Sequence, residues 1–243
     1  MGRISNRLKN NSWFKSQLDE FRGDESNKGK RFELNNEDFH KCFGDNTPTT
    51  GFDRHYIYHT AWAVRYLIDN KIDEHTDISS TLYFSATASA FTKINFFDYR
   101  PAELELTNLS TQAGDLCDLK FEDDSIKSLS CMHTIEHVGL GRYGDPIDYD
   151  GDLKASKELS RVLAKGGNLL IVLPVGSKSL IQYNAHRIYT KNQVIEMFEG
   201  EGLKIKEFTL IPEHSKDGGL VPDPSDELLN KQKYACGCFI FTK

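Results

Sequence analysis

The sequence predicts an α/β protein whose mostly parallel sheet carries helices on both faces. Residues 121–134 open with an acidic turn and continue as a short apolar run, which is typical of a buried strand. An amphipathic helix is expected over residues 152–163, and a second buried strand over residues 168–175. A strand, a crossover helix and a second strand form a unit that favours parallel pairing, because parallel strands need a long connection.

Composition limits the classes of protein that fit. With 243 residues, of which 38% are hydrophobic, the chain can bury one good core, so one main domain is expected. The net charge of −6 gives no field that would gather nucleic acid. No apolar run is long enough to span a bilayer, and the five cysteines are odd in number. We therefore expect a cytoplasmic protein with reduced thiols that binds neither nucleic acid nor membrane.

The first 52 residues differ in composition from the rest of the chain. They are polar and rich in Asn, Lys and Asp, yet they contain several aromatic side chains, which are too many for a disordered tail. We expect residues 1–52 to form a cover segment with one helix over residues 12–21. Residues 53–243 are expected to form the main domain.

Strand and helix patterns alternate through the main domain. A helix over residues 53–68 comes first, with Asp53 as its N-cap. Thr190 is the N-cap of a later helix, and Gly166 and Gly167 are the C-cap signal that ends the helix over residues 152–163. The other expected elements are strands over residues 75–80, 93–99, 108–113, 203–211 and 234–242, and helices over residues 82–91 and 190–200.

Two segments resemble class I S-adenosylmethionine-dependent methyltransferases. They are L-K-F-E-D-D-S-I-K-S-L-S-C-M-H-T-I-E-H-V at residues 119–138 and K-E-L-S-R-V-L-A-K-G-G-N-L-L-I-V-L-P at residues 157–174. They cover the fourth and fifth strands, and the chain is identified as similar to an uncharacterised bacterial family beside those enzymes. The resemblance implies a Rossmann-like sheet of seven strands in the order 3-2-1-4-5-7-6, an antiparallel last strand and S-adenosylmethionine as the cofactor.

The resemblance also implies a cofactor cleft at the carboxyl ends of the strands. Asp98, with Tyr99, ends the second strand, where a carboxylate can accept from both ribose hydroxyls. Asp98 is alternatively a turn residue before Pro101. The segment Gly114, Asp115 and Leu116 resembles the turn that pairs with adenine, and a plain Gly-Asp turn is the alternative. His133 is assigned to the cofactor cleft because it ends the fourth strand.

The loop after the first strand departs from the family pattern. Class I methyltransferases carry an acidic residue and closely spaced glycines there, whereas residues 77–81 contain no glycine. We assign Asp77 to the cofactor as the acidic residue of this loop, and Ser79 because a hydroxyl group can also donate to the cofactor's carboxylate. An altered or lost pocket remains the alternative. His55, Tyr56 and His59 face the cleft or form the outward side of an amphipathic helix.

Candidate catalytic residues follow the fourth and fifth strands. His137 and His186 are candidate bases, and Tyr143 and Arg187 complete the predicted acceptor side. Either histidine is alternatively structural. The arginines Arg187, Arg142 and Arg54 suit an anionic acceptor, such as a phosphorylated or nucleotide-linked sugar.

No metal site is predicted. His133 to His137 spell H-x-x-E-H, but the zinc-peptidase motif needs one helix across all five residues, and His133 ends a strand. The acidic residues of 141–152 are interpreted as a solvated loop that caps the next helix. A divalent cation bound by these carboxylates together with His137 is the alternative.

The predicted function is methyl transfer from S-adenosylmethionine to a small molecule or a glycan precursor, at oxygen or nitrogen. Two alternatives remain: a methyltransferase-fold protein without catalysis that acts as a partner or regulator, and another enzyme on the same fold. The sequence indicates no oligomeric state.

Overall fold

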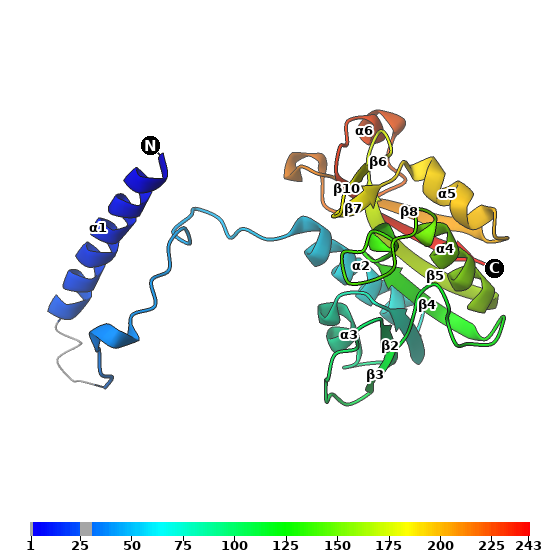
Figure 1. Ribbon diagram of the computed structural model, residues 1–243, viewed down its shortest axis with the longest axis horizontal. Coiled ribbons are helices and arrows are strands. Elements are labelled where there is room, and N and C mark those ends of the chain that lie inside the picture. The colour runs from blue at the N-terminus through cyan, green and yellow to red at the C-terminus, as the bar shows by residue number, and fades with distance from the viewer. Residues whose placement is uncertain (1, 25–30) are drawn as a thin grey trace. The chain divides into compact units, whose positions relative to one another are not determined.

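An eight-stranded sheet forms the centre of the main domain in the computed structural model, which describes residues 2–24 and 31–243 (Figure 1). Its order is β3-β2-β1-β4-β5-β10-β8-β9. Strands β1 to β5 pair in parallel, and β10, β8 and β9 join antiparallel. The strands are β1 (Glu74–Ile78), β2 (Lys93–Asp98), β3 (Leu109–Ala113), β4 (Ile126–Met132), β5 (Leu163–Val175), β8 (Lys204–Ile211), β9 (Val221–Pro222) and β10 (Ala235–Thr242).

This order confirms the predicted class and its 3-2-1-4-5-7-6 arrangement, with β8 and β10 as the sixth and seventh strands. Two features were not predicted. The short β9 extends the edge of the sheet beyond β8, and β6 (Leu180–Gln182) pairs with β7 (His186–Ile188) in a separate hairpin. Strands of two or three residues are too short to show an alternating pattern in the sequence.

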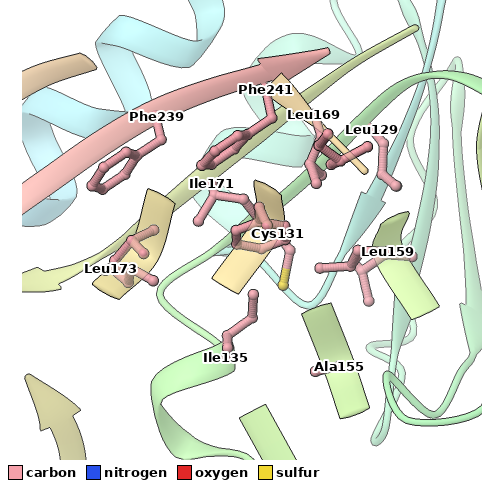
Figure 2. Packing of buried hydrophobic residues seen from close by; sticks show 14 of the residues in the cluster. Leu129, Cys131, Ile135, Ala155, Leu159, Leu169, Ile171, Leu173, Phe239 and Phe241 are labelled. Atoms are coloured by element: carbon pink, nitrogen blue, oxygen red, sulfur yellow. The ribbon is translucent and has the colours of Figure 1, made fainter. Parts of the chain in front are cut away.

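Helices cover both faces of the sheet. On one face α2 (Arg54–Asp69) and α3 (Leu82–Ala88) contribute Leu67 and Phe84 to a buried cluster. On the other, α4 (Gly151–Val162) and α5 (Lys191–Glu199) bury Leu159 and Phe198 against β4, β5 and β10. Figure 2 shows Leu159 in this cluster with Leu129 of β4, Ile171 of β5 and Phe241 of β10. Each apolar side chain removed from water contributes roughly 1.5–3 kcal/mol, so this double layer holds the sheet.

Two predicted helix starts are confirmed by their caps. Asp53 accepts a hydrogen bond from the backbone N–H of Tyr56 at the start of α2. Thr190 and Gln193 form a reciprocal capping box at the start of α5. The remaining helices of the domain are short: η3 (Ile135–His137), η4 (Ser215–Asp217) and α6 (Asp226–Asn230).

The predicted glycine cap of α4 is wrong. The helix ends at Val162, and β5 begins at once with Leu163, which pairs with Ile126. Gly166 lies at φ +74°, and a Cβ on Gly167 would be only 2.8 Å from the carbonyl oxygen of Ala164. The two glycines therefore allow a close backbone approach inside β5, where the register shifts, instead of ending a helix.

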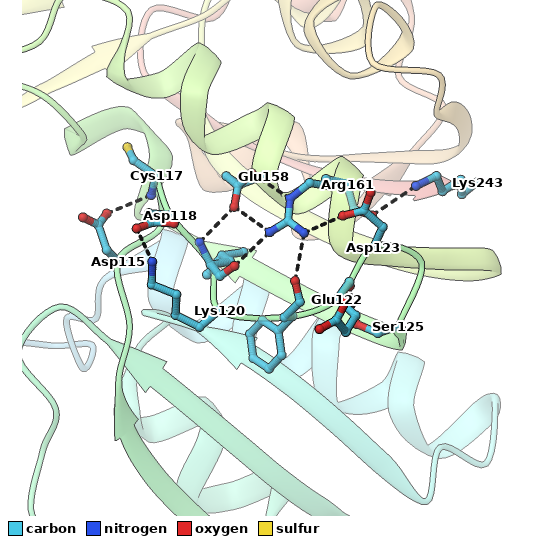
Figure 3. Close-up of polar contacts among 12 residues, drawn as sticks. Asp115, Cys117, Asp118, Lys120, Glu122, Asp123, Ser125, Glu158, Arg161 and Lys243 are labelled. Carbon is cyan, nitrogen blue, oxygen red and sulfur yellow. Dashed lines mark hydrogen bonds and ion pairs between the residues drawn. The ribbon is translucent and has the colours of Figure 1, made fainter.

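Arg161 on α4 fixes the connection that leads into β4 (Figure 3). Its guanidinium donates to the carbonyl oxygens of Leu119 and Phe121, each at 2.8 Å, and to Glu158 Oε2 at 2.8 Å. The same Glu158 oxygen accepts from the backbone N–H of Leu119 at 2.9 Å. This network anchors the segment that follows the predicted adenine turn.

The other compact unit is Met1–Phe52, which precedes the domain unit Asp53–Lys243. It contains α1 (Gly2–Gly23), which includes the helix expected over residues 12–21, and η2 (Asn36–Asp38). Its role as a cover stays a prediction. Among the residues that the structure describes, none of the helices has both the length and the apolar character that crossing a membrane requires.

Candidate active site

A cavity of about 420 Å³ opens at the carboxyl ends of β1, β2, β3 and β4. Its size is within the ordinary range for small-molecule sites, and its position is where open α/β sheets bind ligands. The sequence-predicted residues on its wall are Ser79, Asp98, Tyr99, Gly114, Asp115, Leu116, His133, His137 and Tyr143. Residues predicted from five separate segments of the sequence therefore line one cavity.

Asp98 and Asp115 form the wall nearest β2 and β3. Asp98 Oδ1 accepts from the backbone N–H of Arg100 at 2.7 Å, and Asp115 Oδ1 accepts from that of Cys117 at 2.8 Å (Figure 3). Each carboxylate is therefore held in place through one oxygen. A carboxylate has about four lone-pair sites, so both retain capacity to accept from a ligand.

The loop after β1 adopts a left-handed conformation without glycine. Ser79 has φ +57°, and its N–H donates to the carbonyl oxygen of Phe97 at 2.7 Å. Thr134 donates its hydroxyl to the carbonyl oxygen of Ser79 at 2.8 Å, and Thr81 caps α3. A non-glycine residue there costs about 1–2 kcal/mol, and such strain is concentrated at functional sites.

Asp77 lies beneath this loop and does not line the cavity. It is fully buried and accepts from the hydroxyls of Ser80 at 2.5 Å, Ser85 at 3.0 Å and Ser130. Burial raises the pKa of Asp77 to about 6. Ser80 in turn accepts from the backbone N–H of Met132 at 3.0 Å, so the predicted cofactor contact is corrected to a support that ties the β1 loop to β4.

Several histidines lie close together around His133, which is on the cavity wall. We use the term histidine cluster for the five residues from α2, the end of β4, η3 and β7 that are linked by contacts to one another, namely His55, His59, His133, His137 and His186. The ring of His55 stacks on that of His133 with centroids 5.2 Å apart, and His59 lies 5.1 Å from His133. Tyr234 stacks on both His55 and His186, at 4.8 and 5.0 Å.

The histidine cluster is mostly neutral. Desolvation lowers the pKa of His55 and His133 to about 4 and that of His59 to about 3. The same cause raises the pKa of Glu136 to about 7. Glu136 Oε1 lies 2.8 Å from Nδ1 of His133 and 3.8 Å from Nε2 of His137.

His137 lines the cavity and has the geometry of a base. Its Nδ1 lies 2.6 Å from the carbonyl oxygen of Ala185, which can only accept, so Nδ1 carries the hydrogen. Arg142 lies 3.4 Å from the same Nδ1, but it donates to that carbonyl oxygen at 3.0 Å, so we assign the tautomer from the shorter contact. Nε2 of His137 is left with a free lone pair.

The other predicted acceptor-side residues divide between the cavity and its support. Tyr143 lines the cavity and lies 5.5 Å from His137 between ring centroids. His186 is 6.3 Å from His137, which places the two histidines together as predicted, but His186 is not on the cavity wall.

Arg187 is buried and does not reach the cavity. It donates to the carbonyl oxygens of Val138 at 2.7 Å and Tyr149 at 2.9 Å, and its Nε lies 3.6 Å from Asp152. Its predicted contact with an acceptor is corrected to a structural role, because its donors are used to hold the loop of residues 138–149.

Two residues of this side were missed by sequence reasoning: Tyr234 and Cys236. Both lie at the start of the last strand, where the apolar pattern indicated only a strand. Tyr56, for which two orientations were open, lies on the cavity wall, whereas His55 and His59 are buried. The pairing of β10 with β5, which in turn pairs with β4, brings Cys236 within 3.5 Å of His133.

Comparisons with known proteins support the fold. Residues 119–217 match a family described as "Caenorhabditis protein of unknown function, DUF268". No curated protein matches the chain. The solved structures it resembles include class I S-adenosylmethionine-dependent methyltransferases.

Three solved structures illustrate the likeness. The 1,6-didemethyltoxoflavin-N1-methyltransferase of Burkholderia thailandensis, solved with bound 1,6-didemethyltoxoflavin and S-adenosylhomocysteine, has a TM-score of 0.54 and 10% identity over 76% of this chain and 78% of its own. A TehB-like SAM-dependent methyltransferase of Corynebacterium glutamicum has a TM-score of 0.50 and 16% identity over 78% and 97%. The cyclase SpnF has a TM-score of 0.50 and 11% identity over 74% and 81%. At these identities the likeness establishes the methyltransferase fold.

Proposed function

We propose that this chain is an S-adenosylmethionine-dependent methyltransferase that acts on a small-molecule or glycan-precursor acceptor. One observation carries the proposal: every residue assigned to the cofactor from the sequence, except Asp77, lines a single cavity at the carboxyl ends of β1 to β4. The methyltransferase of similar fold from Burkholderia thailandensis was solved with S-adenosylhomocysteine, which supports the choice of cofactor.

The donor set fits that cofactor. Asp98 retains lone pairs for a ribose diol, and Asp115 with the backbone N–H of Leu116 offers the acceptor and donor that adenine needs. The hydroxyls of Ser79 and Thr81 lie on the same wall and suit a carboxylate. When bound, S-adenosylmethionine would supply an activated methyl group for in-line displacement.

His137 would take the acceptor's proton at Nε2, since its Nδ1–H is held by Ala185. Arg100 and Arg142 both lie against the Tyr143 ring, at 4.8 and 5.1 Å. Arg100 lines the cavity, and Arg142 lies against Tyr143, which also lines it; two cations so placed favour an anionic acceptor. Arg54, which was also considered for this role, donates to the carbonyl oxygens of Pro212 and Gly218.

The glycine-free loop keeps two other functions open, namely another enzyme on the same fold or a partner protein without catalysis. The cyclase SpnF, which has a similar fold, is an example of a different activity. The five free thiols fit the cytosolic location that we also propose.

Calorimetric titration of the full chain with S-adenosylhomocysteine tests the proposal. Binding is expected, and Asp98→Ala should weaken it by about 1–3 kcal/mol, the scale of lost hydrogen bonds to a charged group. Asp118→Ala is the matched control, because Asp118 follows the same turn but is not on the cavity wall. If the folded wild-type chain does not bind S-adenosylhomocysteine, the proposal is wrong.

A further inference from the structure

Three potential metal ligands converge beside the cavity. The ligand atoms of His55, His133 and Cys236 all lie within 4.8 Å of one another, and all three residues are buried. Cys236 Sγ is 3.5 Å from Nε2 of His133. The residues come from α2, the end of β4 and the start of β10, so the fold assembles this group from distant parts of the chain.

We propose that His55, His133 and Cys236 bind a single zinc ion. Two imidazole nitrogens and one thiolate form a donor set that zinc prefers, and three protein ligands with a fourth position left open are typical of its non-structural sites. Tetrahedral bonds of about 2.0–2.3 Å place ligand atoms about 3.3–3.6 Å apart, so the trio must close by about 1 Å on binding. The His55 ring must also turn out of its stack on His133, because an imidazole lone pair lies in the plane of its ring.

Glu136 supports this assignment. Its Oε1 lies 2.8 Å from Nδ1 of His133, which directs the Nε2 lone pair of that ring toward Cys236. A carboxylate that accepts from the distal nitrogen of a ligand histidine is the usual outer partner of a zinc site. His133 also has φ +56°, a strained conformation for a non-glycine residue. This backbone conformation sets the direction of its Cα–Cβ bond.

Unpartnered buried atoms surround the trio. Within the described part of the chain, His59 Nε2 and Glu136 Oε2 are buried without a hydrogen-bond partner. Nδ1 of His59 lies 2.6 Å from the carbonyl oxygen of His55, so Nδ1 carries the hydrogen and Nε2 has an unused lone pair. Buried polar atoms are rarely left unsatisfied, so these two indicate that the surroundings of the trio are polar; Glu136 contacts the opposite nitrogen of His133 and would not itself bind the ion.

A nucleophilic role for Cys236 fits less well. Cys236 contacts His133, which in turn contacts Glu136, and such a chain of contacts could activate a thiol. However, Cys236 is fully buried and is not on the cavity wall. Reactive cysteines are partly exposed. His133, by contrast, lines the cavity and provides the route by which a metal ion could enter.

Metal binding to the purified full chain tests the proposal. After stripping with a chelator, the chain should take up one equivalent of Zn²⁺ in competition with a chromophoric chelator. Co²⁺ in its place should show the near-ultraviolet absorption of a cobalt–thiolate bond. Cys236→Ser should abolish that absorption and weaken Zn²⁺ binding at least tenfold.

Cys131→Ser is the matched control, because Cys131 is equally buried but belongs to the core cluster on the α4 side of the sheet. It should leave both signals unchanged. Glu136→Gln should retain the cobalt–thiolate absorption and weaken Zn²⁺ binding about tenfold, as expected of a positioning residue. Should Cys236→Ser fail to give a native circular dichroism spectrum, His55→Gln provides the same comparison from α2.

Two results would overturn the site. One is wild-type chain that binds less than a tenth of an equivalent of Zn²⁺ after loading; the other is a folded Cys236→Ser or His55→Gln variant with wild-type affinity and an unchanged cobalt spectrum. Neither depends on S-adenosylhomocysteine, so the outcome is separate from that of the proposed function.

Discussion

The two sides of the cavity are built in different ways. The wall at β1, β2 and β3 consists of strand-end residues such as Asp98 and Asp115, whose backbone turns lie next to them in the sequence. The opposite side is formed by His133 and His137 of the histidine cluster, whose other members lie behind them. The cluster comes from α2, the end of β4, η3 and β7, and its members meet only in the folded chain. One side is a series of local turns, and the other is a long-range assembly.

The difference has a physical consequence. Local turns hold each carboxylate where it can still accept from a ligand, so the first wall is suited to recognition. The histidine cluster instead removes polar groups from water, which lowers the pKa of His55, His59 and His133 and raises that of Glu136. Changes in the cluster should therefore affect stability, catalysis and metal binding, whereas changes in the first wall should mainly affect cofactor affinity.

The largest expected effect is on stability, at the edge of the histidine cluster. Arg187→Ala should reduce the free energy of unfolding by about 3–5 kcal/mol, because it leaves Asp152 and two carbonyl oxygens without a buried cation. Urea denaturation followed by circular dichroism measures this change. Arg142→Ala is the control: it is exposed and should change stability by less than about 0.5 kcal/mol. Equal stability of the two variants would contradict the structural role assigned to Arg187.

The next effect separates the two histidines that the sequence could not rank. His137→Gln should lower turnover about a hundredfold or more while cofactor affinity stays nearly constant, because only His137 combines a place on the cavity wall with a free Nε2. His186→Gln should lower turnover by only a few fold. Steady-state rates with the true acceptor and calorimetry with S-adenosylhomocysteine measure the two quantities. A reversed ranking would move the base to His186.

The pH dependence of turnover follows from the same assignment. The pKa of His137 is lowered, and burial is the largest cause. Arg142 and His186 lower the pKa further, whereas Glu136 raises it. A base acts in its neutral form, so turnover should be constant above pH 6.5 and should fall only below this ordinary imidazole value. The residual rate of His137→Gln should lack that acidic decline. A decline that persists in the variant would assign it to another group, Glu136 being the first to examine.

The sequence could predict the features that depend on local turns, but not those that depend on long-range contacts. The strand order and the first wall were predictable because each turn residue directly follows a strand pattern, as Asp98 follows β2. Asp77 was placed at the right loop but in the wrong role, since only the structure shows the three serine hydroxyls that enclose it. Cys236 carried no signal, because a thiol in an apolar strand is usually a small hydrophobic residue.

The smallest expected effect tests whether the first wall is a ligand site or only a turn. Ser79 adopts φ +57°, where a side chain costs about 1–2 kcal/mol, so Ser79→Gly should raise the free energy of unfolding by up to about 1 kcal/mol after glycine's greater chain entropy is subtracted. The hydroxyl lost in that change makes only a 3.3 Å contact with the carbonyl oxygen of Phe97. Ser79→Val should instead destabilise the fold, since a β-branched residue is poorly accommodated at positive φ.

Stability and affinity should then move in opposite directions in Ser79→Gly. If the Ser79 hydroxyl donates to the cofactor's carboxylate, its removal should weaken S-adenosylhomocysteine binding by about 1 kcal/mol, roughly fivefold, in a chain that is as stable as wild type or more so. Functional sites commonly retain strain of this kind because relieving it costs affinity. A Ser79→Gly variant that gains stability and binds as tightly as wild type would show that the hydroxyl serves only the turn, and recognition of the carboxylate would then rest on Thr81 and the N–H groups at the start of α3.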